Sequence, residues 1–511
     1  MLRQKNRWMW IASLLCLLSM NAGAQISMTL DDALIYSIEN SPELQTALMN
    51  LRRYKFSLDA QRASLKSRFS LTLNPVSYNR NRYFENRLSE WYTNESFSTS
   101  GTFSISQPII WTGATVSLNN RFGWQNNKSS ITGGVDNDNR AFSNELYLSI
   151  TQPLFRYNQI KFDLKSIELD YENALINYSL RRLNLENSIT NQFYNVYTAQ
   201  NNLEISKAEL KDAEANYNVI KNKVDADLST KDELYQAELN LATARSTVDN
   251  RVVALENAKD DFKKILGIDL STDLEIIAQV EAKPVSVDLG KAISNALSSR
   301  LELKQREISR TELDMQMKQI KESNSFNGEL SMSIGITGDN ERLNDIYRTP
   351  TNNPRVALSF NVPIFDWGER KARIKAQEIA IEMHNLETDE ERKAIEIAIR
   401  KSYRNLNNLL TQISIAEQSV KNAQLTYDLN AERYRNGELT GMEMNQFQTE
   451  LSNKKMSYVS TIIEYKKELL NMKILTLYDF ENNKALIPMS VVPASEKKEN
   501  NIPKQYKDQI P

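Results

Sequence analysis

Histidine and cysteine are almost absent from this chain of 511 residues, which holds one of each. The single histidine, His384, falls on a long predicted helix, where we expect a surface position. Without a cluster of histidines, cysteines and carboxylates, the sequence provides no zinc-type ligand set. We find no glycine-rich phosphate loop and no nucleophile beside a base. These absences exclude the common enzyme and cofactor classes, so we expect no catalytic, cofactor or metal residues.

Glycine and proline are also scarce, with 14 and 12 residues. A chain built mostly from β-turns needs more of both, so the composition favours long helices. Basic and acidic residues nearly balance, at 63 and 65. This balance leaves no excess of positive charge for a nucleic-acid partner, which we therefore exclude.

The first 24 residues have the pattern of a secretory signal peptide. A positive start, an apolar run and a small-residue cleavage site follow one another: Arg3, Lys5 and Arg7, then residues 8–20, then residues 22–24. The apolar run is short for an uncleaved anchor helix, which needs about 20 residues. Removal of the three basic residues leaves 60 basic against 65 acidic residues, a net charge of −5.

Cys16 lies near this cleavage site, as a lipid-bearing cysteine does. The residue before it is Leu15, where a lipid-attachment signal needs a small residue, so we expect the cysteine to leave with the signal peptide. No later segment has about 18 consecutive apolar residues, and the sequence therefore predicts no second transmembrane helix.

The remainder of the chain contains two copies of one unit. The openings 30–34 and 289–293 share a Leu-x-x-Ala pattern followed by an aliphatic residue, at an offset of 259 residues. Further on, residues 153–155 and 363–365 match at an offset of 210. A fixed offset marks a duplicated structural unit. The fall in offset of 49 places an insertion of about that size in the first copy, before Pro153.

Each copy has a very long amphipathic segment with apolar residues spaced alternately by four and three, the a/d pattern of a coiled coil. In the second copy the seam consists of Ile395, Ile399, Ser402, Leu406, Leu409, Ile413, Ala416, Val420, Ala423 and Tyr427. The equivalents 210 residues earlier run from Leu185 to Tyr217 and are also mostly apolar. A helix of roughly 65 residues spans about 100 Å, so we expect two long helical hairpins.

Six segments alternate apolar with small polar residues, near 69–78, 99–107, 114–124, 143–152, 328–338 and 354–362. An apolar face opposite a polar face over about 10 residues is typical of a strand between lipid and water. The edge of a soluble β-sandwich gives the same alternation. Aromatic residues gather at both ends of these segments, as they do at the two interfaces of a membrane.

The insertion holds two of these segments, within 99–124. The link between them is short, and longer polar links at about 79–98 and 125–141 flank them. Short turns on one side and long loops on the other fit a membrane barrel, and two added strands return the chain to the side it came from. We therefore predict six strands per protomer. The alternative is a hairpin that caps the sheet from outside and leaves four.

A tight turn is expected at the end of each long helix, followed by Thr-x-x-Glu at Thr230 and Glu233 in the first copy and at Thr440 and Glu443 in the second. This spacing predicts a capping box, in which the threonine hydroxyl and the glutamate carboxylate each satisfy a free backbone N–H.

The sequence thus predicts an α+β fold, mostly α, with an internal duplication. The expected parts are a signal peptide over 1–24, a first repeat over 25–285 with strands about 69–152 and a helical hairpin about 158–268, a second repeat over 286–480 with strands about 328–362 and a helical hairpin about 368–477, and a disordered C-terminal tail over 481–511.

In its motifs the chain resembles the TolC-type outer-membrane efflux channel family from Thr29 to about Phe480. The resemblance rests on the openings, on the strand-to-helix junctions at Pro153 and Pro363, and on Arg433-Tyr434-x-x-Gly437-x-x-Thr440-x-x-Glu443 at the second turn. It implies a homotrimer in which long coiled-coil hairpins form a periplasmic α-barrel tunnel and the strands form one transmembrane β-barrel in outer-membrane lipid. The six strands predicted for each protomer would give this barrel about eighteen strands. It also implies an inner-membrane pump and a periplasmic adaptor protein as partners, and no catalysis.

In this family an acidic residue at each turn lines the closed periplasmic aperture. The resemblance carries that role to Glu233 and Glu443, with Tyr434 as a network partner. The chain departs from the family pattern at Leu439 and Gln446, which replace a basic and an acidic residue of some members, and at Asp227, which replaces a turn glycine. A differently wired aperture would then draw on three further residues, Asp225, Asp227 and Arg435.

The function implied is a passive exit duct of a tripartite efflux pump for small molecules or drugs, in the cell outer membrane with its helical part in the periplasm. The same fold serves as the exit duct of a type I protein secretion system, which the sequence does not separate from efflux. From another class, a secreted structural coiled-coil protein shares the long helices, but the strands argue against it.

Overall fold

The computed structural model describes residues 26–86, 89–131, 137–278, 281–323 and 325–486. The predicted signal peptide lies outside the described residues, as does the tail from residue 487. The described residues divide into two compact units: the helical unit comprises residues within 26–50, 175–304 and 389–486, and the sheet unit comprises residues within 51–174 and 305–388.

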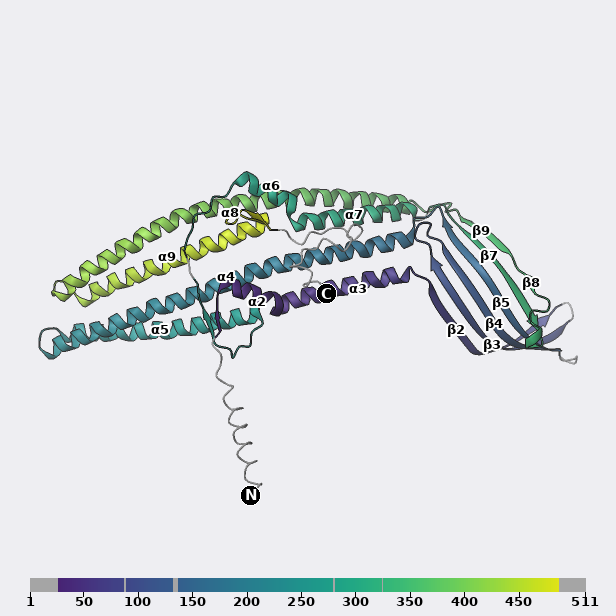
Figure 1. Cartoon of the computed structure of the whole chain (residues 1–511), viewed down its shortest axis with the longest axis horizontal. Helices are drawn as coiled ribbons and strands as arrows, with labels where there is room; N and C mark the ends of the chain where they lie inside the picture. The colour runs from purple at the N-terminus through teal and green to yellow at the C-terminus, as the bar shows by residue number, and fades with distance from the viewer. Residues whose placement is uncertain (1–25, 87–88, 132–136, 279–280, 324, 487–511) are drawn as a thin grey trace, which may run out of the picture. The chain divides into compact units, whose positions relative to one another are not determined.

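One antiparallel sheet forms the centre of the sheet unit (Figure 1). Its strands are β2 (Arg68–Glu85), β3 (Glu90–Pro108), β4 (Thr115–Ile131), β5 (Asn137–Leu154), β7 (Asn327–Asn340) and β9 (Arg355–Asn361), joined in that order, with the two-residue β8 (Thr351–Asn352) also paired to β7. The inserted segments are β3 and β4, which pair with their neighbours along their lengths. The six long strands match the prediction, and a cap outside the sheet is wrong.

The strands of the first repeat are longer than predicted, because β2 to β5 have 17 to 19 residues each. The segments expected as polar links over 79–98 and 125–141 are mostly strand. Backbone pairing continues there after the apolar alternation has stopped, and polar residues on both faces leave no lipid-facing pattern to detect. The two edges of the sheet differ in length, at 18 residues for β2 and seven for β9.

The register gives the sheet two chemically different faces. One row across five strands is apolar: Phe69, Ile105, Leu118, Leu148 and Ile334. The adjacent row on the opposite face is made of serines: Ser106, Ser117, Ser149 and Ser333. Successive side chains of a strand point to opposite faces, so the alternation seen in the sequence becomes one apolar and one hydroxyl-lined surface.

The strand-to-helix junctions contain the two prolines noted in the sequence. Pro153 is the second-to-last residue of β5. The side-chain amide of Gln152 donates to the carbonyl oxygens of Pro153 (2.7 Å) and Thr112 (2.9 Å). Pro363 lies between β9, which ends at Asn361, and the helix that begins at Glu369. Proline has no N–H to leave unsatisfied where strand pairing ends.

Each repeat also carries a helix between its short opening helix and its strands, namely α3 (Pro42–Ser64) and α7 (Leu301–Glu322). Within the sheet unit, Nε2 of His384 is 2.9 Å from the carbonyl oxygen of Arg306 on α7, and the ring is buried. The surface position expected for His384 is therefore wrong. The imidazole faces α7 and forms its hydrogen bond with the backbone of that helix.

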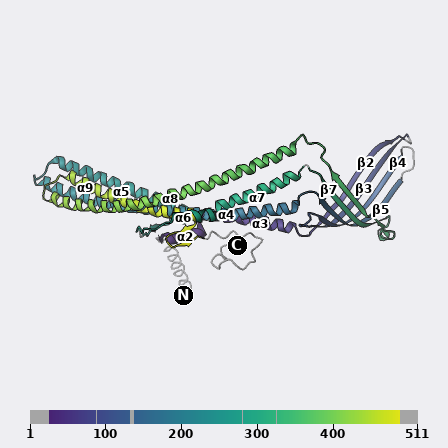
Figure 2. The same cartoon turned by 90° about the horizontal axis from the view of Figure 1, so that it is seen from above.

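Duplication is visible in the helix lengths. The long helices α4 (Gln159–Asp225) and α8 (Glu369–Arg435) have 67 residues each, and the returning helices α5 (Lys231–Leu266) and α9 (Gly441–Thr476) have 36 each. The opening helices α2 (Leu30–Asn40) and α6 (Leu289–Ser299) have 11 each. Figure 1 shows α9 running back beside α8, and Figure 2 shows the same helices from above.

The predicted coiled-coil seam is the core of the helical unit. Ile395, Ile399 and Leu406 of α8 pack in one buried cluster with Tyr465 and Met472 of α9. In the first repeat, the rings of Phe193 on α4 and Phe262 on α5 lie edge to face with centroids 6.0 Å apart. Burying such side chains contributes about 1.5–3 kcal/mol each, so the seam holds each hairpin together.

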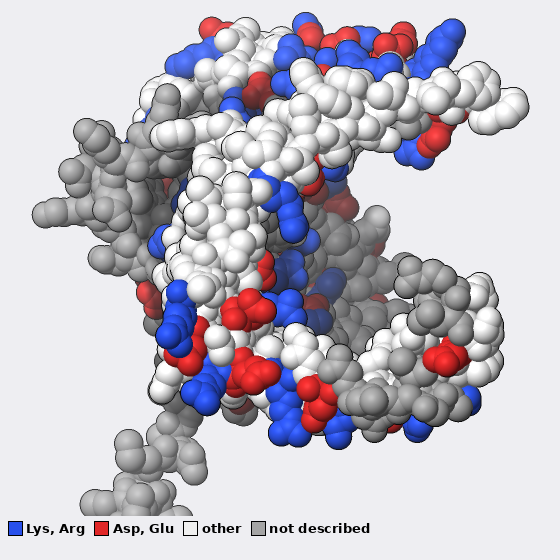
Figure 3. Space-filling view, turned by 90° about the vertical axis from the view of Figure 1, so that its right-hand side faces the viewer, with Lys and Arg blue, Asp and Glu red and all other residues white. Residues whose placement is uncertain are grey.

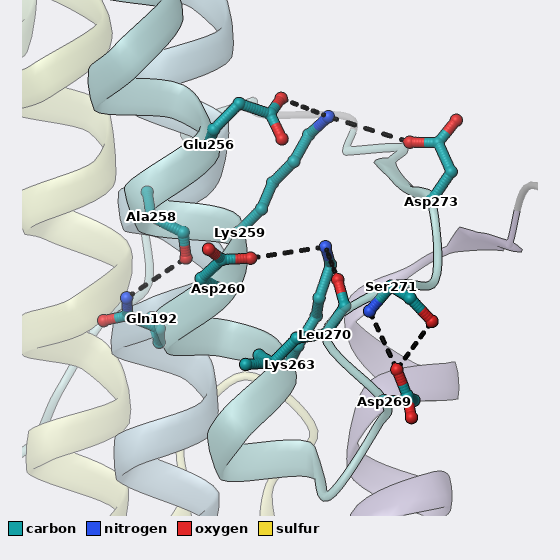
Figure 4. Close-up of polar contacts among 10 residues, drawn as sticks. All are labelled: Gln192, Glu256, Ala258, Lys259, Asp260, Lys263, Asp269, Leu270, Ser271 and Asp273. Carbon is teal, nitrogen blue, oxygen red and sulfur yellow. Dashed lines mark hydrogen bonds and ion pairs between the residues drawn. The ribbon is translucent and has the colours of Figure 1, made fainter.

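The buried side chain of Lys263 stabilises the C-terminal end of α5. Its side chain is almost fully buried, and Nζ donates to the carbonyl oxygen of Leu270 (3.0 Å) and approaches Oδ1 of Asp260 (3.4 Å), as Figure 4 shows. A cation at a helix C-terminus also complements the helix dipole. Gly267 then caps the helix with φ of 77°. The chain continues to β6 (Leu274–Ile276), which pairs in parallel with β1 (Ile26–Met28).

After α9 the chain forms a small hairpin, in which β10 (Tyr478–Asp479) pairs with β11 (Lys484–Ala485). This pairing falls at the start of the tail that the sequence predicted to be disordered from residue 481. Among the described residues, no helix is both long enough and apolar enough to cross a membrane.

Candidate aperture at the helical turns

The two tip turns repeat one backbone geometry. In the first repeat, the Leu228 N–H donates to the carbonyl oxygen of Lys223 (2.7 Å), and in the second the Glu438 N–H donates to that of Arg433 (2.9 Å). The residue before each donor is in the left-handed region, Asp227 with φ of 59° and Gly437 with φ of 81°. Aspartate is one of the few residues that enter this region at low cost, which explains how Asp227 replaces the turn glycine.

The second turn has a complete capping box. Oγ1 of Thr440 accepts from the Glu443 N–H (3.3 Å), while the Glu443 carboxylate accepts from the Thr440 N–H and hydroxyl (both 2.9 Å). These hydrogen bonds, from the Thr440 backbone first and its hydroxyl second, lower the pKa of Glu443, and the positive charge of Arg433 lowers it further. Glu443 is therefore an exposed carboxylate held in its charged form.

The first turn has half of this box. Oγ1 of Thr230 accepts from the Glu233 N–H at 3.3 Å, as in the second repeat. The Glu233 carboxylate, however, accepts from the hydroxyl of Ser229. The second repeat has Leu439 at the position of Ser229, so no hydroxyl competes there. The reciprocal half of the capping box expected at Glu233 is replaced by this contact.

Tyr434 links the two repeats within the helical unit. Its hydroxyl donates to Oδ1 of Asn216 on α4, and Nζ of Lys223 lies 5.8 Å from its ring centroid. Partial burial raises the pKa of the Tyr434 phenol, and the negative charge of Glu233 raises it further. The structure thus brings two of the predicted residues, Tyr434 and Glu233, into electrostatic contact.

A second polar contact between the repeats lies further from the turn. Oδ2 of Asp212 accepts from Nε2 of Gln448 (3.0 Å) and from the hydroxyl of Tyr427 (3.4 Å). Asp212 and Asn216 are one helical turn apart on α4, so both face the second repeat. Neither residue was predicted from the sequence, because polar residues beside an apolar seam look like ordinary solvated positions. Only their i, i+4 spacing marks them.

The other predicted residues stay at the surface. Asp225, Asp227 and Arg435 are exposed around the turns. Near them, Nε of Arg433 lies 3.4 Å from Oε2 of Glu438, an ion pair that was not predicted from the sequence. This part of the described chain has no group of three or more residues that could hold a metal ion. The turns therefore present exposed carboxylates, among them Glu233 and Glu443.

Comparison with known proteins gives three kinds of match. Residues 292–471 match the family model of the outer membrane efflux proteins. A segment of 242 residues is 24% identical to the outer membrane protein TolC of Escherichia coli K12 and covers 46% of this chain and 48% of TolC. The chain thus spans about half the length of the curated relative that it matches.

Solved structures match over most of the chain. The Campylobacter jejuni CmeC outer membrane channel has a TM-score of 0.67 at 14% identity, with 92% of this chain and 90% of CmeC covered. The Neisseria gonorrhoeae MtrE outer membrane channel, in its open state, has a TM-score of 0.63 at 14% identity, with 89% and 90% covered. A membrane protein from Pseudomonas aeruginosa gives 0.65 at 13%, with 88% and 90% covered. These likenesses establish the fold, a helical hairpin pair with a β-sheet.

Proposed function

The chain belongs to the TolC-type outer membrane efflux protein family, and from this premise we propose that it is one protomer of the homotrimeric exit duct of a tripartite efflux pump. It is an outer-membrane protein whose helical part lies in the periplasm. In the proposed duct, small molecules move passively through the helical tunnel and the β-barrel to the outside. An inner-membrane pump supplies the energy for export, and a periplasmic adaptor protein joins this pump to the duct.

The two-faced sheet is the observation that carries this proposal. The apolar row through Ile105, Leu118 and Leu148 suits contact with lipid, and the serine row through Ser117 and Ser149 suits contact with water. A strand between hydrocarbon and an aqueous lumen needs this alternation. A soluble sandwich would cover its apolar face with a second sheet or with helices. Here that face is exposed, as Phe69 and Ile334 each retain about two-thirds of their surface.

The sheet edges support an assembly of several copies. β2 and β9 are edge strands of the sheet, and among the described residues each is paired along one side only. Unpaired backbone groups are not tolerated in hydrocarbon, so a sheet in a membrane closes into a barrel. Neighbouring copies supply the missing edges, and six long strands per protomer give about eighteen in a trimer.

At the tips, we propose that Glu233 and Glu443 line the periplasmic aperture. Three copies would bring rings of carboxylates together there and favour the entry of cations. Tyr434 contributes by tying the second repeat to Asn216 of the first. The exposed residues Asp225, Asp227 and Arg435 add charge around these rings.

Ion conductance of the purified protein and the drug sensitivity of cells that lack its gene together test the proposal. The purified chain, added to planar bilayers, is expected to form ion-conducting trimers. Deletion of its gene in the native host is expected to sensitise the cells to dyes and detergents, with rescue by the intact gene. Conductance without any change in sensitivity, together with loss of a secreted protein, would instead identify a protein secretion duct.

A further inference from the structure

The outer part of the sheet carries a layered surface that the transport function does not use. Further outward, the apolar face carries four aromatic residues: Tyr78 on β2 lies opposite Phe97 on β3, and Trp124 on β4 lies opposite Phe142 on β5. The rings of Phe97 and Trp124 meet diagonally with centroids 5.9 Å apart, which joins the two pairs into one aromatic row. A register shift between Asn74 and Ser77 exchanges the two faces of β2, and this shift places Tyr78 in the row. Aromatic rows of this kind mark the level of the lipid headgroups.

Immediately outside the aromatic row lies a row of charges across four strands. Arg80 is opposite Glu95, Glu95 is opposite Lys128, and Lys128 is opposite Asp138. Nε of Arg80 is 3.1 Å from Oε1 of Glu95, and Asp138 also pairs with Arg140, at 2.9 Å. Seen from the sheet end of the molecule, Figure 3 shows charged side chains of both signs lying beside one another. Exposed pairs of this kind contribute about 0–1 kcal/mol, so an anionic ligand can compete for the cations.

Further out again, a cation and aromatic rings are combined at the tip of the β2–β3 hairpin. The guanidinium of Arg82 lies over the ring of Trp91, 4.8 Å from its centroid, and Phe84 packs edge to face against Trp91 at 5.3 Å. Both rings remain more than two-fifths exposed, at 45% for Trp91 and 43% for Phe84. Among the described residues of β2 to β5, this face carries four basic and two acidic residues outside the aromatic row.

The depth of this surface indicates the size of its ligand. Trp91 is six residues beyond Phe97 on β3, which is about 20 Å along the strand. The headgroup layer of a phospholipid bilayer is only about 5–8 Å thick on each side. A surface this deep is therefore matched by a larger headgroup, one with phosphates for arginine and lysine and flat sugar rings for exposed aromatic side chains.

We propose that this outward face, with Arg80, Arg82, Lys128 and Arg140 around Trp91, binds the phosphorylated saccharide headgroups of glycolipids in the outer leaflet. The site lies on the same face of β2 to β5 as the apolar row and leaves the serine-lined face free. It rests on the outer-membrane location of the chain and is independent of what the duct exports.

Native mass spectrometry of the detergent-purified full chain tests the proposal. The probes are a bisphosphorylated diglucosamine lipid, the same lipid without phosphates, and phosphatidylglycerol. We expect wild-type protein to retain the bisphosphorylated glycolipid well above the other two. Each basic residue near a charged lipid surface changes binding several-fold, so the Arg80→Gln/Lys128→Gln double variant should retain about tenfold less of it.

Arg121→Gln is the matched control, because Arg121 is an exposed cation on β4 whose odd position faces the opposite side of the sheet. It should bind the glycolipid as wild type does, and planar-bilayer conductance and circular dichroism should show both variants folded. Equal retention of all three lipids by the wild type, or undiminished retention by the double variant, overturns the proposal. Equal retention of phosphatidylglycerol and the bisphosphorylated lipid alone overturns the saccharide part. A wild-type chain that binds the glycolipid but conducts no ions would contradict the exit duct and leave this site standing.

Discussion

The phenol hydroxyl of Tyr434 donates a hydrogen bond to the amide oxygen of Asn216, and this contact joins the long helix of the second repeat to that of the first. It lies two residues before the second turn, where the two hairpins come together within the helical unit. A half-buried hydrogen bond of this type contributes about 0.5–1.5 kcal/mol. Its removal should therefore loosen the tips without unfolding the seam.

Tyr434→Phe tests this contact, because it deletes the hydroxyl and keeps the ring. We expect faster amide hydrogen exchange over residues 216–240 and 430–445 and a higher single-channel conductance. Tyr427→Phe is the control, since its hydroxyl makes a longer contact of 3.4 Å with Asp212, which keeps its bond from Gln448. Equal effects of the two variants would contradict a special role for Tyr434.

Replacement of the tip carboxylates should change ion selectivity. Glu443→Gln is expected to lower the cation preference of the channel, and Glu233→Gln/Glu443→Gln to lower it further. The pKa of Glu443 is lowered from 4.5, so its charge and its capping contribution are present at neutral pH and are lost only as the pH falls through that lowered value. In the Glu233→Gln variant, where Glu443 is the remaining glutamate of the two, reversal potentials measured across a salt gradient at pH 7 and at pH 5 should therefore agree. Unchanged selectivity in the double variant would leave Glu443 with capping alone.

The exposed turns are the expected docking surface of the adaptor. Cysteines placed singly at 225–229 and 436–439 should cross-link to a periplasmic partner in cells, because the lone Cys16 falls within the predicted signal peptide and adds no background. A cysteine at the exposed position Ile415, near the middle of α8, is the control. Cross-links at Ile415→Cys but not at the turns would refute docking at the tips.

Gly267→Ala should destabilise the helical unit strongly. A Cβ at Gly267 would lie 2.5 Å from the carbonyl oxygen of Asn40, and the residue also has φ of 77°. Gly437→Ala is a matched control, because Gly437 has φ of 81° and open space around the added carbon. The control should lose about 1–2 kcal/mol from the left-handed conformation alone. Thermal unfolding followed by circular dichroism should place Gly267→Ala clearly below it, and equal losses would exclude a steric effect at Asn40.

Lys263→Met should cost about 1–3 kcal/mol, because the half-buried hydrogen bond from the charged Nζ to the carbonyl oxygen of Leu270 would be lost. Lys264→Met, one residue later and exposed, should be near neutral. The same unfolding measurement compares them. A stable Lys263→Met variant would mean that the packing of the lysine stem matters more than its charge.

Sequence reasoning was strongest where one period persists over many residues. The seam through Ile395 and Ile399 predicted a helix of about the observed 67 residues, since every turn repeats the same requirement for burial. The six strands followed from alternation within the apolar band. Strand ends were missed, because beyond the membrane-facing part neither face of β3 or β4 has an apolar pattern to reveal pairing.

Single contacts were less predictable than elements. The complete capping box at Thr440 and the incomplete one at Thr230 share the sequence Thr-x-x-Glu. They differ because the Glu233 carboxylate accepts from the Ser229 hydroxyl, whereas the Glu443 carboxylate accepts from the Thr440 N–H. His384 looked like a solvated residue on a polar stretch, but its partner is a backbone carbonyl, which no side-chain pattern announces. Asn216 likewise gains its role from a helix more than two hundred positions away.

The unequal edge strands have a consequence for how the protein matures. Among the described residues, β2 is an edge strand of 18 residues and β9 is an edge strand of seven, and each is paired along one side only. An isolated copy entering lipid would therefore expose the N–H and C=O groups of two outer edges. Each such group costs several kcal/mol in hydrocarbon. Insertion is therefore expected to be steeply concentration-dependent, because a copy reaches its stable membrane form only when others arrive with it.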